Sequence, residues 1–244
     1  MIWSAALESS CPLGAVALGR DGELVASERL APGMRHARDL VPVLGRLAAR
    51  EKVDLGQLGL VILDLGPGSF TGVRVGVAVA KAIYLATGCQ MVGVLATDAV
   101  AARVAERHPE VCVVIDATRG ELYAARYQLT DQPAEPGRGR FTGAAGTWER
   151  VFGPAIVRPA ELVTALQPGC CVTGGGLSRY GDVFRAGEFV LAPEPDRFPA
   201  VEWVHALGWE RYRSGLTDDP HALEPMYLRL PAAEERWRER SGHV

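Results

Sequence analysis

The sequence predicts an α/β protein whose two halves begin alike. Hydrophobic residues make up 48% of the 244 residues and charged residues 23%, which is typical of a globular chain that forms a core. Up to residue 107, strand-length apolar runs and helical periodicities follow one another in the order β-β-β-α-β-α-β-α. A strand pair joined by a tight turn recurs after residue 110, so we expect a second half that resembles the first, although no sequence repeat is visible.

The chain opens with an antiparallel meander. Three strands are expected, at residues 2–7, 15–18 and 23–30. A turn at residues 8–14 joins the first two strands, and the Asp21-Gly22 step joins the others as a hairpin turn. Residues 35–50 then have apolar side chains at the spacing of an amphipathic helix. Pro42 is awkward inside this helix, so the helix either begins near Asp39 or kinks at Pro42.

The most distinctive stretch is residues 66–88, with the sequence GPGSFTGVRVGVAVAKAIYLATG. The apolar run at residues 60–65 precedes it and predicts a strand buried on both faces of a sheet. Residues 66–72 form a turn rich in Gly, Pro, Ser and Thr, and residues 73–87 predict a helix that ends at Gly88. The unit is therefore a strand, a tight turn and a helix.

The turn at residues 66–72 has two interpretations, which remain open at this point. In the first, its glycines and Pro67 only let the chain reverse, with Ser69 and Thr71 as turn and N-cap groups. In the second, the N–H groups at the start of the helix bind an anion such as phosphate. Against the second, the turn contains no lysine and lacks the P-loop pattern.

The helix at residues 73–87 is apolar almost all round. Arg74 and Lys81 are its only charged residues, and they share one stripe because they lie seven positions apart. An ordinary surface helix has a single apolar stripe, which faces its own core. We therefore expect one face of this helix to lie on its own sheet, and a second face to be covered by another helix or another protein.

The rest of the chain continues the alternation. Strands are expected at residues 90–95, 111–116, 121–129 and 171–173, and helices at residues 97–107, 159–166, 177–185 and 200–213. Residues 130–154 are rich in Gly, Pro and Arg, and are expected to form a long exposed loop with a short edge strand. Residues 224–231 are expected to be extended, and residues 232–244 to form a charged tail.

Composition and motifs argue against several classes of site. The net charge of −3 argues against a free-standing nucleic-acid binder. The five cysteines include no CxxC pair, so we expect reduced thiols and no zinc or redox site. The five histidines are scattered without an HExxH motif, so we expect no metal site, and Ser69 lacks the GxSxG elbow of serine hydrolases. We expect no signal peptide and no membrane span, which favours a cytoplasmic protein.

Three motifs resemble one known family. GPGSFTGVRVGVAVAKAI after a buried strand, IDATRGELY at residues 115–123 and PMYLR at residues 225–229 closely resemble the TsaB (YeaZ) family, over nearly the whole chain. The resemblance implies a two-lobed actin-like ATPase fold (ASKHA, ribonuclease H-like), with mixed sheets flanked by helices. The lobes would be residues 1–108, carrying the partner-binding helices, and residues 109–231, followed by the charged tail at 232–244.

The resemblance also implies a function. TsaB proteins are non-catalytic partners of TsaD, and with the ATPase TsaE they support threonylcarbamoyl transfer to the adenosine beside the tRNA anticodon. We therefore expect no catalytic residue and no cofactor of the chain's own, because ATP and metal would sit on TsaD or TsaE. The expected partners are TsaD, TsaE, a second copy of this chain when TsaD is absent, and tRNA only within the complex. No membrane partner is expected.

The resemblance and the apolar helix together predict a partner interface on the helices of the first lobe. The predicted interface residues are Val73, Arg74, Val77, Ala80, Lys81 and Tyr84, with Leu40 and Leu44 from the preceding helix. Arg74 and Lys81 either pair with acidic residues of a partner or only solvate the exposed stripe. A rim pair of this kind would contribute only about 0.2–1 kcal/mol.

The actin-like fold also implies a place for a nucleotide, so an ATPase or small-molecule kinase is kept as the alternative function. The residues of this possible vestigial site are Glu8, Ser9, Asp116, Arg119, Gly174 and Gly175. Its first turn is a poor phosphate cradle, because Pro12 has no N–H and Glu8 stands where catalytic relatives carry Asp. Asp116 can alternatively serve as a structural turn carboxylate.

Overall fold

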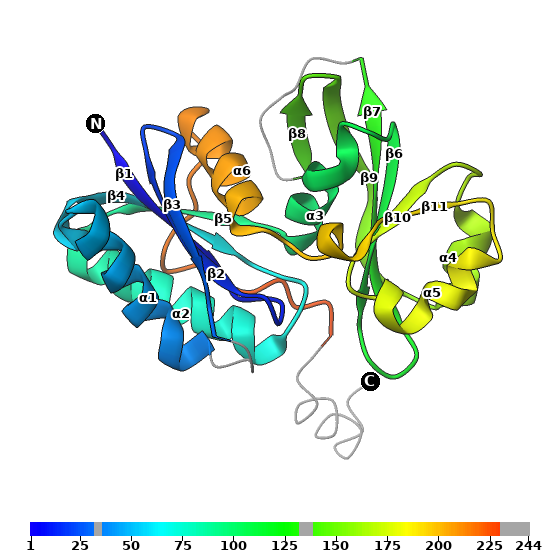
Figure 1. Cartoon of the computed structure of the whole chain (residues 1–244), viewed down its shortest axis with the longest axis horizontal. Helices are drawn as coiled ribbons and strands as arrows, with labels where there is room; N and C mark the ends of the chain where they lie inside the picture. The colour runs from blue at the N-terminus through cyan, green and yellow to red at the C-terminus, as the bar shows by residue number, and fades with distance from the viewer. Residues whose placement is uncertain (32–35, 132–138, 230–244) are drawn as a thin grey trace.

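Two mixed β-sheets, each flanked by helices, make up the computed structural model of the chain (Figure 1). The structure describes residues 1–31, 36–131 and 139–229. The predicted tail at 232–244 lies outside these residues. The sheets lie side by side as two lobes, joined through the middle of the molecule by α3 and α6 (Figure 1).

The first sheet contains the opening meander. Its strands are β1 (Trp3–Glu8), β2 (Ala15–Arg20), β3 (Glu23–Arg29), β4 (Leu58–Asp64) and β5 (Gln90–Val94). The spatial order is β3-β2-β1-β4-β5. Strands β1, β2 and β3 pair antiparallel, whereas β1 with β4 and β4 with β5 pair parallel. The predicted order of elements up to residue 107 is confirmed.

The second sheet repeats this topology. Its strands are β6 (Glu110–Asp116), β7 (Leu122–Thr130), β8 (Arg140–Gly143), β9 (Gly146–Val157), β10 (Cys171–Thr173) and β11 (Val190–Leu191). The order is β11-β10-β6-β7-β9-β8. Strands β6, β7 and β9 pair antiparallel, and β6 with β10 and β10 with β11 pair parallel, as in the first sheet. The expectation that the second half resembles the first is therefore confirmed at the level of topology.

The helices cover both sheets. They are α1 (His36–Glu51), α2 (Phe70–Thr87), α3 (Ala96–Ala105), α4 (Pro159–Ala165), α5 (Leu177–Arg185) and α6 (Val201–Arg213), with single 3₁₀ turns at Leu55–Gln57 and Glu194–Asp196. Helices α1 and α2 lie side by side on one face of the first sheet, and α6 returns from the second lobe to pack on β1, β4 and β5 (Figure 1).

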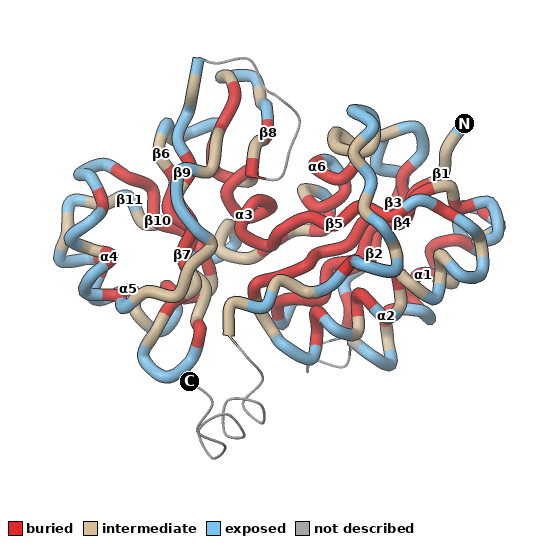
Figure 2. Tube along the Cα trace, turned by 180° about the vertical axis from the view of Figure 1, so that it is seen from behind, coloured by how far each residue is buried: buried red, intermediate tan, exposed pale blue. Residues whose placement is uncertain are grey.

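One hydrophobic cluster is shared by the two lobes. It includes Ile62 of the first sheet, Val100 of α3, Val204 of α6, and Val113 and Tyr127 of the second sheet. Figure 2 shows the same region as buried chain between the sheets. The lobes are therefore joined to each other through α3 and α6.

The prediction of a long loop at residues 130–154 is wrong, but the short edge strand predicted within it is confirmed as β8, at the edge of the second sheet. The described part of this stretch contains β8 and most of β9, a strand of 12 residues that pairs with β7. Trp148 is buried there and stacks on Phe141 with ring centroids 5.8 Å apart. Gly153 has a positive φ of 73° and lies where the β7–β9 register shifts. The glycine that suggested a loop therefore belongs to an irregularity inside a strand.

One helix start differs from expectation, and the structure excludes a start near Asp39 for the other helix. Helix α2 begins at Phe70, three residues early, because Ser69 caps it: its side-chain oxygen accepts the Gly72 N–H at 3.2 Å. Helix α1 begins at His36 and runs through Pro42, which is exposed. The predicted stop at Gly88 is confirmed, since this residue is the left-handed C-cap of α2.

Candidate functional site

A cleft of about 650 Å³ lies between the lobes, in the size range of small-molecule sites. From the first lobe it is lined by the turn after β1 and the turn before α2, and from the second lobe by the β6–β7 turn and Gly175. Prolines and aromatic rings supply much of the wall, namely Pro12, Pro67, Phe70, Tyr123, Phe198 and Pro199. Asp116 and Arg119 line this cleft, as the nucleotide-site prediction requires.

The first turn is occupied by its own carboxylate. Glu8 Oε1 accepts the backbone N–H groups of Ser10 at 2.7 Å and Cys11 at 3.2 Å. The next residue, Pro12, has no N–H. Both Glu8 and Ser9 are fully buried, beneath the cleft surface. These two donors in the turn are therefore taken up by an internal carboxyl oxygen and are not free for a phosphate.

A second buried carboxyl lies beside Glu8. The Ser10 hydroxyl oxygen is 2.9 Å from Glu8 Oε1 and 2.7 Å from Asp64 Oδ2. The Ser10 hydroxyl has one proton and can donate it to only one of these two carboxyl groups. At the other contact the hydroxyl oxygen must accept a hydrogen bond, which requires that carboxyl group to be protonated. Burial, reinforced by the Asp64 charge, raises the pKa of Glu8 well above its ordinary value, and burial also raises the pKa of Asp64. The direction of both shifts and the geometry at Ser10 therefore favour a proton shared by the Glu8–Asp64 pair.

The second turn is held by local contacts. Asp116 Oδ1 accepts the Thr118 N–H at 2.8 Å, and Asp116 Oδ2 faces Arg179 Nη1 at 3.3 Å. Thr118 and Arg119 both have positive φ, which non-glycine residues adopt mainly in tight turns. Asp116 therefore acts as a turn carboxylate here.

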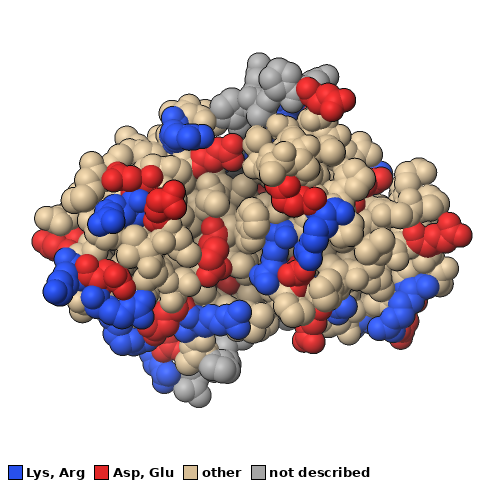
Figure 3. All heavy atoms as spheres, turned by 45° about the horizontal axis from the view of Figure 1, so that its top comes forward, with Lys and Arg blue, Asp and Glu red and all other residues tan. Residues whose placement is uncertain are grey.

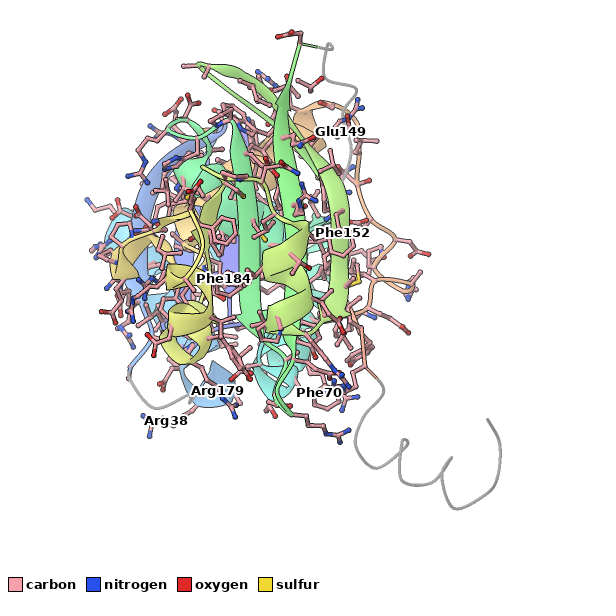
Figure 4. All side chains as sticks on the ribbon, turned by 90° about the vertical axis from the view of Figure 1, so that its right-hand side faces the viewer. Arg38, Phe70, Glu149, Phe152, Arg179 and Phe184 are labelled. Atoms are coloured by element: carbon pink, nitrogen blue, oxygen red, sulfur yellow. The ribbon has the colours of Figure 1, made fainter. Side chains whose placement is uncertain are left out.

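Arg179 and Phe70 lie at the same end of the molecule in Figure 4, on α5 and α2.

The third turn is shaped by close backbone packing. A Cβ on Gly174 would clash with the carbonyl oxygen of Val114 on β6, and φ there is +113°. A Cβ on Gly175 would lie 2.9 Å from the Phe198 ring. Gly175 thus reaches the cleft, but Phe198 already lies against it. These close approaches explain the glycine run without a nucleotide.

The glycine turn before α2 fits the structural interpretation. Ser69 N–H donates to the Ser10 carbonyl oxygen at 2.7 Å, which ties the start of α2 to the first turn. A Cβ on Gly68 would clash with the Ser10 carbonyl, and a Cβ on Gly76 would clash with the Ser9 hydroxyl. The glycines are therefore needed because α2 approaches the β1–β2 turn closely.

Most of the predicted interface residues face inward. Val73, Val77 and Ala80 of α2 are buried, as are Leu40 and Leu44 of α1, and all but Val73 belong to the hydrophobic core of the first lobe. Lys81 and Tyr84 are half-buried. Among the eight predicted residues, Arg74 alone is exposed. The structure thus differs from the expectation for the five apolar residues, because they lie on the faces of α1 and α2 that pack on the first sheet and on each other.

A different stripe of α2 is open. Its exposed residues at helical spacing are Phe70, Arg74, Ala78, Ala82 and Leu85, which we call the outer face of α2. Leu85 is 77% exposed, and Val41 on the neighbouring α1 is 55% exposed. By length and composition α2 is also the one described helix that could cross a membrane, but it packs on the first sheet and α1, with five of its residues buried.

The C-terminal segment lies along the flank of α2, which the sequence did not indicate. Arg74 Nε donates to the Tyr227 hydroxyl at 2.7 Å, and the Arg74 guanidinium stacks 3.8 Å from the centroid of the Phe70 ring. The Phe70 and Tyr227 rings are 5.6 Å apart, and Tyr84 contacts the His221 ring edge-on. The aromatic and arginine content of PMYLR is the one signal that could have located this contact.

The surface offers no sign of a large basic patch on the face shown in Figure 3, where Lys and Arg alternate with Asp and Glu. Within residues 1–31, 36–131 and 139–229, no group of three or more His, Cys, Asp or Glu residues could hold a metal ion. The five cysteines are all unpaired and buried.

Comparisons with known proteins agree on one group. A family model described as "TsaD: tRNA N6-adenosine threonylcarbamoyltransferase" matches residues 32–169. The chain is 27% identical to the Escherichia coli "tRNA threonylcarbamoyladenosine biosynthesis protein TsaB" over 97% of both chains. It is 25% identical to the Bacillus subtilis protein of the same name, over 92% of this chain and 93% of the relative.

A solved structure shares the fold. YeaZ from Pseudomonas aeruginosa superposes with a TM-score of 0.77 at 22% identity, over 93% of this chain and 100% of that one. At 22% identity, this match shows only that the fold is shared. The predicted fold class, two mixed sheets flanked by helices, is confirmed.

Proposed function

Because this chain belongs to the TsaB (YeaZ) family, within the group that the TsaD family model describes, we propose that it is a non-catalytic partner of TsaD. In this proposal it supports threonylcarbamoyl transfer to the adenosine beside the tRNA anticodon, in the cytoplasm and together with TsaE. Without TsaD it pairs with a second copy of itself, and it meets tRNA only within the complex. The near full-length match to relatives named for threonylcarbamoyladenosine biosynthesis supports the pathway.

The observation that carries the partner role is the outer face of α2. Ala78, Ala82 and Leu85 leave an apolar stripe in solvent, and Val41 on the neighbouring α1 is also exposed. Small side chains in the middle of the stripe would let a partner helix approach closely, with Phe70 and Leu85 at its ends. Exposed apolar surface of this kind marks contact sites on proteins of ordinary composition. The partner surface is therefore α2 together with α1, but through residues other than the buried Val73, Val77 and Ala80.

Arg74 lies on the rim of this surface. Its guanidinium is stacked on Phe70 and bonded to Tyr227, so it is already held in one orientation. A fixed exposed cation gives specificity for an acidic group on the partner more than it gives affinity. Lys81 and Tyr84 both contact His221, so they lie at the edge of the outer face of α2.

The geometry of the first turn supports a role without catalysis. A nucleotide phosphate needs free N–H donors, and the Ser10 and Cys11 donors bind Glu8. The alternative, an ATPase or kinase with its own site, would require Glu8 to act on a substrate, but this side chain is fully buried. In our proposal ATP and metal therefore belong to TsaD and TsaE.

Two measurements test the proposal together. The chain is mixed with TsaD from the same organism, and the masses of the chain alone and of the mixture are measured by size-exclusion chromatography with light scattering. A stable mixed complex, and restoration of tRNA threonylcarbamoylation by TsaD and TsaE only when this chain is added, would support the helper role. Transfer activity that is unchanged by the chain would exclude it.

A further inference from the structure

Residues 223–229 run from one lobe toward the other. They are anchored to the first lobe in three ways: Leu223 is buried in its core, Met226 N–H donates to the Leu65 carbonyl at 2.8 Å, and Tyr227 lies against Phe70 and Arg74. In Figure 1 the segment is drawn in orange-red below the first sheet. Its backbone is therefore fixed to the lobe that carries α2.

Arg229 leaves this anchored segment and binds the second lobe. Its Nη1 donates to the Ala117 carbonyl oxygen at 3.0 Å, and its Nη2 forms an ion pair with Glu121. The two side chains of the ion pair are only 17% and 29% exposed. Charge-assisted bonds from one guanidinium to two acceptors on the β6–β7 turn fix its direction as well as its distance.

The contact of Arg229 with the second lobe can restrain movement of the two lobes. The lobes are joined through α3 and α6, and Arg229 lines the cleft between the lobes. A rotation of the lobes about α3 and α6 that widened the cleft would pull Ala117 and Glu121 away from Arg229. Hinge rotations of packed lobes around a cleft are a common form of conformational change.

We propose that residues 223–229 are an interlobe latch: the segment is held on the first lobe, with Tyr227 against Phe70 and Arg74, and Arg229 holds the cleft closed by binding the second lobe. The latch connects two regions that no element of either sheet joins directly, the β6–β7 turn and the start of α2. Its existence does not depend on the partner proposed above.

The latch is tested by the distance between the lobes in the isolated chain. Spin labels are placed on Ala49→Cys of α1 and Ala160→Cys of α4, which are both exposed, whereas the native cysteines are buried. Pulsed electron–electron double resonance is recorded on labelled chain diluted with unlabelled chain, so that distances between copies do not contribute. The variants are Arg229→Met, which keeps an apolar stem without the donors, and Glu121→Gln.

The matched control is Arg185→Met. Arg185 is also an arginine in an ion pair, but its partner Asp182 is on the same helix. We expect one narrow distance distribution for the parent and for Arg185→Met, and a broader distribution with a longer mean for Arg229→Met. Glu121→Gln should shift in the same direction by less. Circular dichroism checks folding; if Arg229→Met does not fold, Glu121→Gln decides. Parent-like distributions in the folded variants would overturn the latch.

Discussion

The carboxylate of Glu8 accepts the backbone N–H of Ser10 at 2.7 Å, within the turn that the two residues share. This bond supplies the turn with a hydrogen-bond acceptor from its own chain. The start of α2 is tied to the same turn through Ser69 and the Ser10 carbonyl oxygen. The place where a nucleotide would be held in an actin-like fold is therefore used here to position the helix that carries the exposed apolar stripe.

The first prediction concerns nucleotide binding. Isothermal titration calorimetry of the isolated chain with ATP and magnesium should give no micromolar binding, because Glu8 occupies the N–H donors of the first turn and Pro12 offers none. Asp116→Ala should leave the titration unchanged. Micromolar binding that disappears in Asp116→Ala would instead favour the ATPase or kinase alternative.

The second prediction concerns pH and the buried carboxyls. Burial and the neighbouring Asp64 raise the pKa of Glu8 above its value in the unfolded chain. Between the unfolded and folded pKa values the folded state holds a proton that the unfolded state has lost, so stability is greatest below this window and falls as pH rises through it. Glu8→Gln keeps an uncharged group in place and removes this dependence.

Urea unfolding at about pH 5 and about pH 8 measures this effect. The free energy of unfolding of Glu8→Gln should rise relative to that of the parent as pH increases. At about pH 8 the relative gain should be about 1–3 kcal/mol, because a tenfold change in proton affinity is worth about 1.4 kcal/mol. Glu161→Gln, at an exposed position on α4, serves as the control and should follow the parent. A constant difference between Glu8→Gln and the parent at both pH values would refute the shared proton.

The third prediction compares two glycines. A Cβ at Gly68 would meet the Ser10 carbonyl, whereas a Cβ at Gly45 in α1 would meet nothing within 4 Å. Gly68→Ala should lower the free energy of unfolding by about 1–3 kcal/mol through forced backbone shifts. Gly45→Ala should raise it by about 0.5–1 kcal/mol through better helix propensity. Thermal unfolding should therefore show a lower melting temperature for Gly68→Ala and a higher one for Gly45→Ala. Equal changes in melting temperature would contradict the close approach of α2 to the first turn.

The fourth prediction separates the two faces of α2. Val77 is buried in the core of the first lobe, so Val77→Glu should unfold the lobe or lower its melting temperature strongly. Ala78 is its exposed neighbour, and Ala78→Glu should leave the melting temperature nearly unchanged. Thermal unfolding by circular dichroism measures both variants, and a cooperative parent-like transition for Val77→Glu would mean that the buried face has been assigned wrongly.

The elements of the fold could be predicted where periodicity and turn chemistry agreed. The strand–turn–helix unit around Gly66–Pro67 and the stop at Gly88 were recognisable because each has a local cause in the chain. Strand β9 was missed because Gly153 and Pro154 resemble a loop, whereas the pairing with β7 that makes them part of a strand comes from residues about 30 positions away.

The orientation of α2 could not be predicted for a related reason. A helix that is apolar all round has no periodicity to say which side faces the sheet, so Val77 and Ala78 are equally acceptable on either face. The contact of Tyr227 with Arg74 spans 153 positions, and the aromatic and arginine content of PMYLR does not say which residues it meets. Tertiary packing alone decides the orientation of α2 and the contact of Tyr227 with Arg74. It therefore also determines which residues of the helix a partner can reach.

The central claim is that the outer face of α2 is a docking surface, and Leu85→Glu tests it most directly. Leu85 is 77% exposed, so a glutamate there should not disturb the fold. Val151→Glu on β9, also at an exposed apolar residue, is the matched control. Sedimentation velocity with TsaD from the same organism should show binding weakened at least about tenfold by Leu85→Glu and unchanged by Val151→Glu, a loss of about 1.4 kcal/mol or more. Full binding by a folded Leu85→Glu variant would contradict the account.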